Sequence, residues 1–219
     1  RKAVALVHNQ RQNEEMEQAA GQNSLPALRE KFFIRLFNNL FDSEEQYTRQ
    51  KEDLGLVFDA PAYVVATCEL VSEKEEQQSR TDLLHLYSSA IQMARDTLAR
   101  YSKGYVATLD ARHFAVVFAL EHEQGGWQAA VEQALAKTAD ILSGYFSLQM
   151  YAAVGSVVQD PRYLGGSYHS GRWGFHAAGP RQPIVFSDEN GAVRPGADPS
   201  VLHETRTGIR RAFEELDAD

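Results

Sequence analysis

The chain has 219 residues, of which 43% are hydrophobic and 24% charged, a composition typical of a globular protein with a full core. Its formal net charge of −8 argues against direct binding to a nucleic-acid backbone, and no apolar run reaches the roughly 20 residues that a membrane helix needs. Residues 1–15 lack the apolar core of a signal peptide, so we expect a cytoplasmic protein that does not contact a membrane.

Two segments precede the first predicted strand. Residues 1–22 are rich in Gln, Glu, Asn and Ala, so we expect a linker helix without a core of its own. Residues 23–53 are expected to form a connector, with an apolar helix capped by Asn23 or Ser24 and then a polar loop. The apolar side chains of this helix recur every three or four residues: Phe32, Phe33, Leu36, Phe37, Leu40 and Phe41. They must be buried, either on the rest of the chain or against a second copy, and the sequence leaves both open.

Residues 54–197 are expected to form the main domain. Tyr63–Leu70 is apolar on both faces, which is typical of an interior strand, and we expect its cysteine, Cys68, to be a core residue. A helix should begin at Thr81 or Asp82 and end near Tyr101. The next elements are a hairpin of strands 105–109 and 114–120, a helix 127–142 and a strand 146–158. This βαββαβ order predicts an α+β fold of the ferredoxin-like type, an antiparallel sheet with both helices on one face.

The C-terminal part continues with a helix from about Pro161 to Ala177 and a short strand, Pro183–Phe186. Asp198 as a cap and Pro199 at the first helical position then predict a connector helix over residues 198–219. The arginines of this last helix are matched by acidic residues, which favours a connector with ion pairs over a helix that contacts DNA.

Three short patterns in the main domain together resemble a known family. They are His113-Phe114-Ala115-Val116-Val117-Phe118 at the hairpin, Val154-Gly155-Ser156-Val157 in the predicted strand 146–158, and Ser167-Tyr168 in the helix after that strand. Residues 24–217 resemble a degenerate GGDEF-like domain, as found in the middle of AraC-type two-component response regulators and of sugar-diacid and purine-catabolism regulators. The sequence departs from the family at Gly171 and Gly174, where alanines are usual.

The resemblance carries expectations about fold and context. It implies a nucleotide-cyclase-like sheet, with a receiver domain before Arg1 and a helix-turn-helix domain after Asp219 in the parent protein. Neither domain lies in this chain, so the resemblance implies that DNA is contacted only through the missing domain.

The hairpin loop decides what the resemblance implies about catalysis. An active GGDEF enzyme needs glycines where its backbone approaches the phosphates of GTP, and carboxylates that hold divalent metal. Aligned on the hairpin phenylalanine, the five positions here are Asp110, Ala111, Arg112, His113 and Phe114. Both glycines are missing, and a guanidinium that repels Mg²⁺ and an imidazole replace the acidic pair. With only Glu69 left as a candidate cleft residue at the end of the first strand, we expect no catalysis, no metal and no cofactor.

The sequence supports three functional hypotheses. The first is a non-catalytic module that transmits a signal within a bacterial transcription regulator and forms a homodimer. The second is a sensor that binds a nucleotide or a sugar acid in the former nucleotide cleft without turning it over. The third, an active diguanylate cyclase, conflicts with the loss of metal ligands. The seven histidines have no zinc-motif spacing, so we expect them to be structural.

Overall fold

The computed structural model describes residues 24–72, 78–101, 103–121, 126–188 and 192–195. The predicted linker helix 1–22 and C-terminal connector helix 198–219 lie outside the described residues. Within them, no helix is both long and apolar enough to cross a lipid bilayer.

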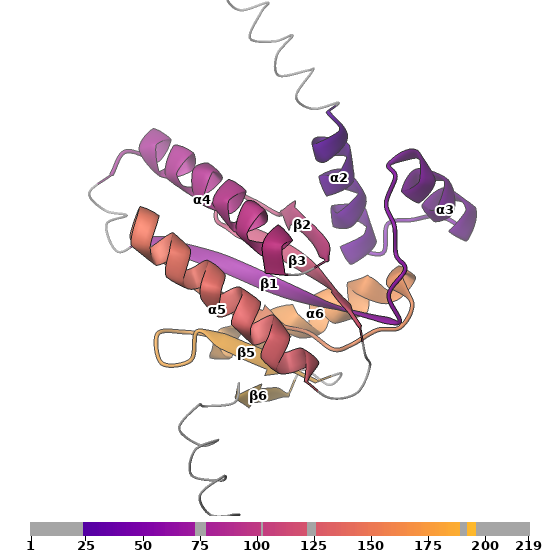
Figure 1. The fold of residues 1–219 in the computed structure, drawn as a ribbon. Helices are drawn as coiled ribbons and strands as arrows, with labels where there is room; N and C mark the ends of the chain where they lie inside the picture. The colour runs from indigo at the N-terminus through magenta and orange to yellow at the C-terminus, as the bar shows by residue number, and fades with distance from the viewer. Residues whose placement is uncertain (1–23, 73–77, 102, 122–125, 189–191, 196–219) are drawn as a thin grey trace, which may run out of the picture.

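The centre of the molecule is a six-stranded sheet in the order β2-β3-β1-β4-β5-β6 (Figure 1). Its elements in chain order are β1 (Ala62–Ser72), α4 (Arg80–Tyr101), β2 (Gly104–Thr108), β3 (His113–Leu120), α5 (Trp127–Phe146), β4 (Leu148–Val154), β5 (Ile184–Ser187) and β6 (Val193–Pro195). β1 pairs antiparallel with both β3 and β4, as the predicted βαββαβ order requires. β5 then adds parallel to β4, and β6 antiparallel to β5. The predicted α+β fold is therefore confirmed.

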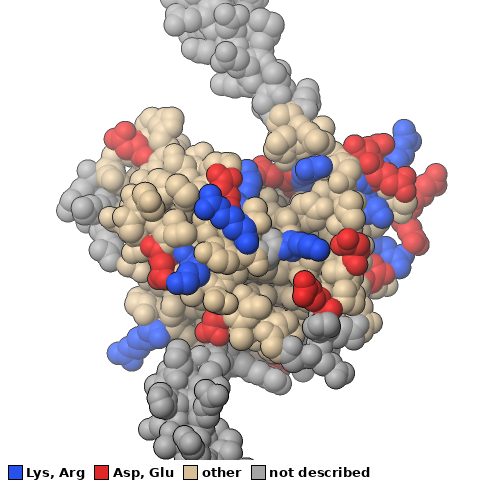
Figure 2. Space-filling view, in the orientation of Figure 1, with Lys and Arg blue, Asp and Glu red and all other residues tan. Residues whose placement is uncertain are grey.

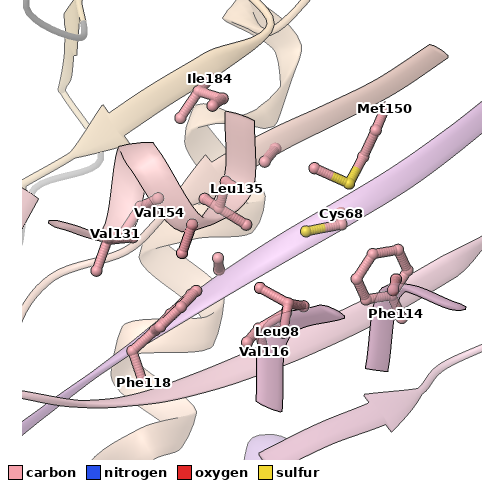
Figure 3. Packing of buried hydrophobic residues seen from close by; sticks show 14 of the residues in the cluster. Cys68, Leu98, Phe114, Val116, Phe118, Val131, Leu135, Met150, Val154 and Ile184 are labelled. Carbon is pink, nitrogen blue, oxygen red and sulfur yellow. The ribbon is translucent and has the colours of Figure 1, made fainter. Parts of the chain in front are cut away.

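One face of the sheet carries the main hydrophobic core under α4 and α5. Alternate residues of β1, such as Val64, Ala66 and Cys68, point to this face because side chains alternate along a strand. Figure 3 shows Cys68, Leu98, Phe114, Val116, Phe118, Val131, Leu135, Met150, Val154 and Ile184 packed between these helices and the strands. Cys68 is fully buried, which confirms it as a core residue, and burial raises the pKa of its thiol.

The opposite face is covered as well, by α2 (Leu25–Phe37) and α6 (Leu164–Gly174). Tyr63 and Val65, two of the odd-numbered residues of β1, lie in this second core with Phe33 of α2 and Tyr168 of α6. The two helices of the βαββαβ unit do share one face as predicted, but the sheet has a helical layer on each side. The reason is visible in β1, which is apolar on both faces and needs cover on both.

The apolar connector helix packs on its own chain. Ser24 caps α2 by accepting a hydrogen bond from the Ala27 amide at 3.4 Å. Phe32, Phe33, Leu36 and Phe37 are at most 3% exposed, whereas Leu40 is 55% exposed and Phe41 is half-buried. The structure thus selects the first of the two alternatives for the four buried side chains, and a dimer through them would require α2 to leave the sheet.

Charged contacts hold α2 at the β2 edge of the sheet. The Glu30 carboxylate accepts hydrogen bonds from the Arg95 guanidinium of α4 at 2.5 Å and from the Thr108 hydroxyl of β2 at 2.8 Å. This anchors the middle of the helix to two other elements.

The prediction of a polar loop at the end of the connector 23–53 was wrong, because this part of the chain forms α3 (Glu44–Asp53). Ser43 caps this helix and accepts a hydrogen bond from the Gln46 amide at 3.2 Å. Tyr47 is its only buried residue, so an apolar period could not reveal the helix. Figure 2 shows acidic and basic side chains gathered over α3, in keeping with its polar sequence.

Other boundaries also differ from the prediction. α5 continues to Phe146, so the predicted strand 146–158 is shorter and runs over Leu148–Val154. The Ser79 hydroxyl, not Thr81 or Asp82, caps α4, because it accepts a hydrogen bond from the Asp82 amide at 3.2 Å. The predicted helix 161–177 is an α-helix only over α6, with 3₁₀ turns at Pro161–Tyr163 and Phe175–Ala177.

Candidate functional site at the β2–β3 hairpin

The turn between β2 and β3 is held by the side chain of its own first polar residue. The amides of Leu109 and Asp110 both donate to the His113 carbonyl, at 2.9 and 3.2 Å. One oxygen of the Asp110 carboxylate accepts from the amides of Arg112 and His113, at 2.9 and 3.0 Å. Asp110 therefore acts as a turn cap, a common role for aspartate.

His113 extends this arrangement across the sheet. Its Nδ1 lies 2.8 Å from both carboxylate oxygens of Asp110, and its Nε2 lies 3.6 Å from Glu69, the residue directly opposite on β1. The structure thus brings together Asp110, His113 and Glu69, all of which the sequence singled out. Although partial burial acts to raise it, the hydrogen bonds from Arg112 and His113 lower the pKa of Asp110 below its ordinary value.

Of the three other loop positions, Arg112 is half-buried. Ala111 is exposed at the tip of the turn, and Phe114 is fully buried in the core under α4 and α5. Phe114 is therefore a core residue of β3. Within the described residues, no group of three or more His, Cys, Asp or Glu side chains is arranged to hold a metal ion.

A hollow of about 540 Å³ opens beside the hairpin, on the face of the sheet that α2 and α6 cover. Residues from four parts of the fold line it: Asn38 after α2, Thr67 of β1, His113 at the start of β3, and Arg172 of α6. Thr67 is 5% exposed, and its hydroxyl has no hydrogen-bond partner among the described residues.

Comparison with models of protein families finds a match for the sequence of this chain. Residues 39–172, more than half of the chain, match the family model described as a GGDEF-like domain. The chain belongs to the GGDEF-like domain family. No curated protein matches the sequence. The matched range starts after α2 and ends within α6, so β5 and β6 lie outside it.

The Ser-Tyr pair of this GGDEF-like domain has a structural role that the sequence did not reveal. The Ser167 hydroxyl accepts a hydrogen bond at 2.8 Å from the Val65 amide of β1, which lies just beyond the end of the β1–β4 ladder. It therefore satisfies a buried strand amide that would otherwise be unpaired. Tyr168 stacks on the Phe37 ring of α2, with the ring centroids 4.8 Å apart.

Glycines allow α6 to approach the sheet so closely that backbone atoms of the two elements lie near each other. A Cβ on Gly155, just after β4, would lie 1.8 Å from the Ser167 carbonyl oxygen, and one on Gly171 would lie 3.0 Å from the Ala153 carbonyl oxygen. Close packing thus explains Gly171, which stands where the family usually has alanine.

Proposed function

We propose that this GGDEF-like domain is a non-catalytic module that transmits a signal within a bacterial transcription regulator of the two-component response-regulator type. The observation that carries the proposal is the hairpin turn, in which the Asp110 carboxylate and the His113 imidazole are paired with each other. Metal-bound GTP needs carboxylate oxygens that face the ligand and a backbone without side chains beside the phosphates. The turn offers neither, because Asp110 and Ala111 stand where the two glycines would be, and Arg112 and His113 stand where the acidic pair would be.

The packing of α6 supports a role in transmission. At one end, a Cβ on Gly165 would lie 3.1 Å from the carbonyl oxygens of both Leu36 and Phe37 in α2. At the other end, a Cβ on Gly174 would lie 1.9 Å from the Ser187 hydroxyl of β5. α6 therefore contacts both the first described helix and the last pair of strands. Because packed interfaces shift between discrete arrangements, a movement of α2 is expected to reach β5 and β6 through α6.

The regulator role also includes partners beyond this chain. We propose a receiver domain before it, a helix-turn-helix domain after it that supplies the DNA contact, and a homodimer as the working unit. The dimer needs a surface other than the buried face of α2. The reading frame that encodes this chain tests the context: a receiver and a helix-turn-helix on its two sides support the proposal, and an enzyme domain in either place contradicts it.

Hydrogen–deuterium exchange tests the transmission step on the chain itself. Phe37→Leu removes the ring that stacks on Tyr168 and should loosen α2 from α6. We expect faster exchange in residues 164–174 and 184–187, with α4 unchanged, under conditions where local opening dominates.

Leu142→Ala is the matched control, because Leu142 is equally buried but lies in the core under α4 and α5. It should speed exchange in α4 and α5 and leave α6 protected. Faster exchange in Phe37→Leu that stops at α2, with β5 unaffected, would contradict transmission through α6.

A further inference from the structure

The hollow beside the hairpin contains a buried polar group without a partner. Thr67 lies on the face of β1 that α2 and α6 cover. It is buried, with only 5% of its surface exposed, yet its hydroxyl makes no hydrogen bond within the described residues. An unpaired buried hydroxyl destabilises the protein, because it has lost its hydrogen bonds to water without gaining others. Because Thr67 lines the hollow, a ligand that brings a hydrogen-bonding group to its floor would remove this cost.

The charges around the hollow select the kind of ligand. The lining contains one arginine, Arg172, and one carboxylate, Asp110, and the Asp110 carboxylate is already held by the hairpin turn. The Arg172 guanidinium lies 5.8 Å from the Tyr168 ring centroid, and within the described part of the chain no carboxylate pairs with it. One guanidinium pairs with one carboxylate through two hydrogen bonds and balances its charge, whereas a dianionic phosphate would keep a second negative charge near Asp110.

The remaining lining residues indicate the body of the ligand. Ile34, Leu109, Tyr168 and Phe175 give the hollow apolar and aromatic walls. Its volume of about 540 Å³ lies within the range of small-molecule sites. An apolar or aromatic skeleton therefore fits between the polar groups.

We propose that this hollow binds a small monocarboxylic acid with an apolar or aromatic body and one hydroxyl group. Its carboxylate pairs with Arg172, and its hydroxyl exchanges a hydrogen bond with Thr67. The site is built from α2, α6 and the hairpin together, so an occupant contacts each of them. Binding is a property of this chain and does not depend on its role in a regulator.

Three related compounds test the proposal by titration into ¹⁵N-labelled protein. 4-Hydroxyphenylacetate carries both groups, phenylacetate lacks the hydroxyl, and 4-hydroxyphenethyl alcohol lacks the carboxylate. We expect 4-hydroxyphenylacetate to shift the amide signals of Thr67, His113 and Arg172, with a Kd about 3- to 10-fold lower than that of either truncated compound. Inorganic phosphate should shift none of these signals.

Two variants separate the two contacts. Thr67→Val keeps the shape of the side chain and should weaken 4-hydroxyphenylacetate to the level of phenylacetate, without changing the Kd of phenylacetate. Arg172→Gln should weaken both acids and leave the alcohol unchanged. Arg162→Gln is the control, because Arg162 precedes α6 and does not line the hollow.

Three outcomes would overturn the proposal. They are the absence of amide shifts with either acid at millimolar concentration, equal weakening of phenylacetate by Thr67→Val, and tighter binding of phosphate than of the acids at the same residues.

Discussion

Gly155→Ala is expected to destabilise the protein strongly because of the close contact between the end of β4 and α6. The new Cβ would lie 1.8 Å from the Ser167 carbonyl oxygen and 2.7 Å from its carbonyl carbon, both of them backbone atoms. The start of α6 must therefore retreat by more than about 1 Å, which disturbs a tightly packed layer. The same shift stretches the hydrogen bond between Ser167 and the Val65 amide. Together these effects should lower the free energy of unfolding by about 3 kcal/mol.

Urea unfolding followed by circular dichroism measures this change. The midpoint should fall without a change in the slope of free energy against urea concentration, because the fold is retained. Gly144→Ala is the control: Gly144 lies in α5 with no atom within 4 Å of an added Cβ, so the helix should gain up to about 1 kcal/mol. If Gly155→Ala unfolds within about 0.5 kcal/mol of the parent, the contact between β4 and α6 is looser than described and the reasoning fails.

Three further predictions follow from single side chains. Ser167→Ala leaves the buried Val65 amide without a partner and should cost about 1–3 kcal/mol in urea unfolding; a cost near zero would mean that water replaces the hydroxyl. Cys68 is fully buried and burial raises the pKa of its thiol, so iodoacetamide at pH 8 should label it only after unfolding; labelling of the native protein would contradict its burial. Because hydrogen bonds from Arg112 and His113 outweigh burial and lower the pKa of Asp110, its ionised form stabilises the fold above the unfolded pKa of about 3.9, and this contribution is lost as the pH falls through the folded pKa. The parent should thus be more stable than Asp110→Asn at pH 7, and this difference should shrink as the folded carboxyl becomes protonated in acid; a difference that stays constant in acid would refute this assignment.

The main sheet could be predicted because its signals are local. The apolar run of β1 and the polar turn between β2 and β3 both leave short-range patterns, and the strand order follows from the order of elements. Ser24, one of the two residues predicted as the cap of α2, was found for the same reason. The helix α3 was not predicted, and the cause is again local: α3 buries only Tyr47, so its sequence has no apolar stripe.

The second helical layer and the site depend on long-range contacts. The stripe from Phe32 to Phe37 showed that α2 is buried, but not on which surface. Glu69 and His113 were each singled out, yet only the register between β1 and β3 places them opposite each other. The unpaired hydroxyl of Thr67 has no sequence signal, because a threonine in a strand is ordinary.

Titration calorimetry with GTP and MgCl₂ tests the central claim most directly, that the hairpin turn of this GGDEF-like domain does not hold a metal-bound triphosphate. We expect no saturable heat, because Asp110 and His113 are paired with each other and Ala111 and Arg112 occupy the tip of the turn. Stoichiometric Mg²⁺-dependent binding of GTP that is lost in Glu69→Gln would contradict this account.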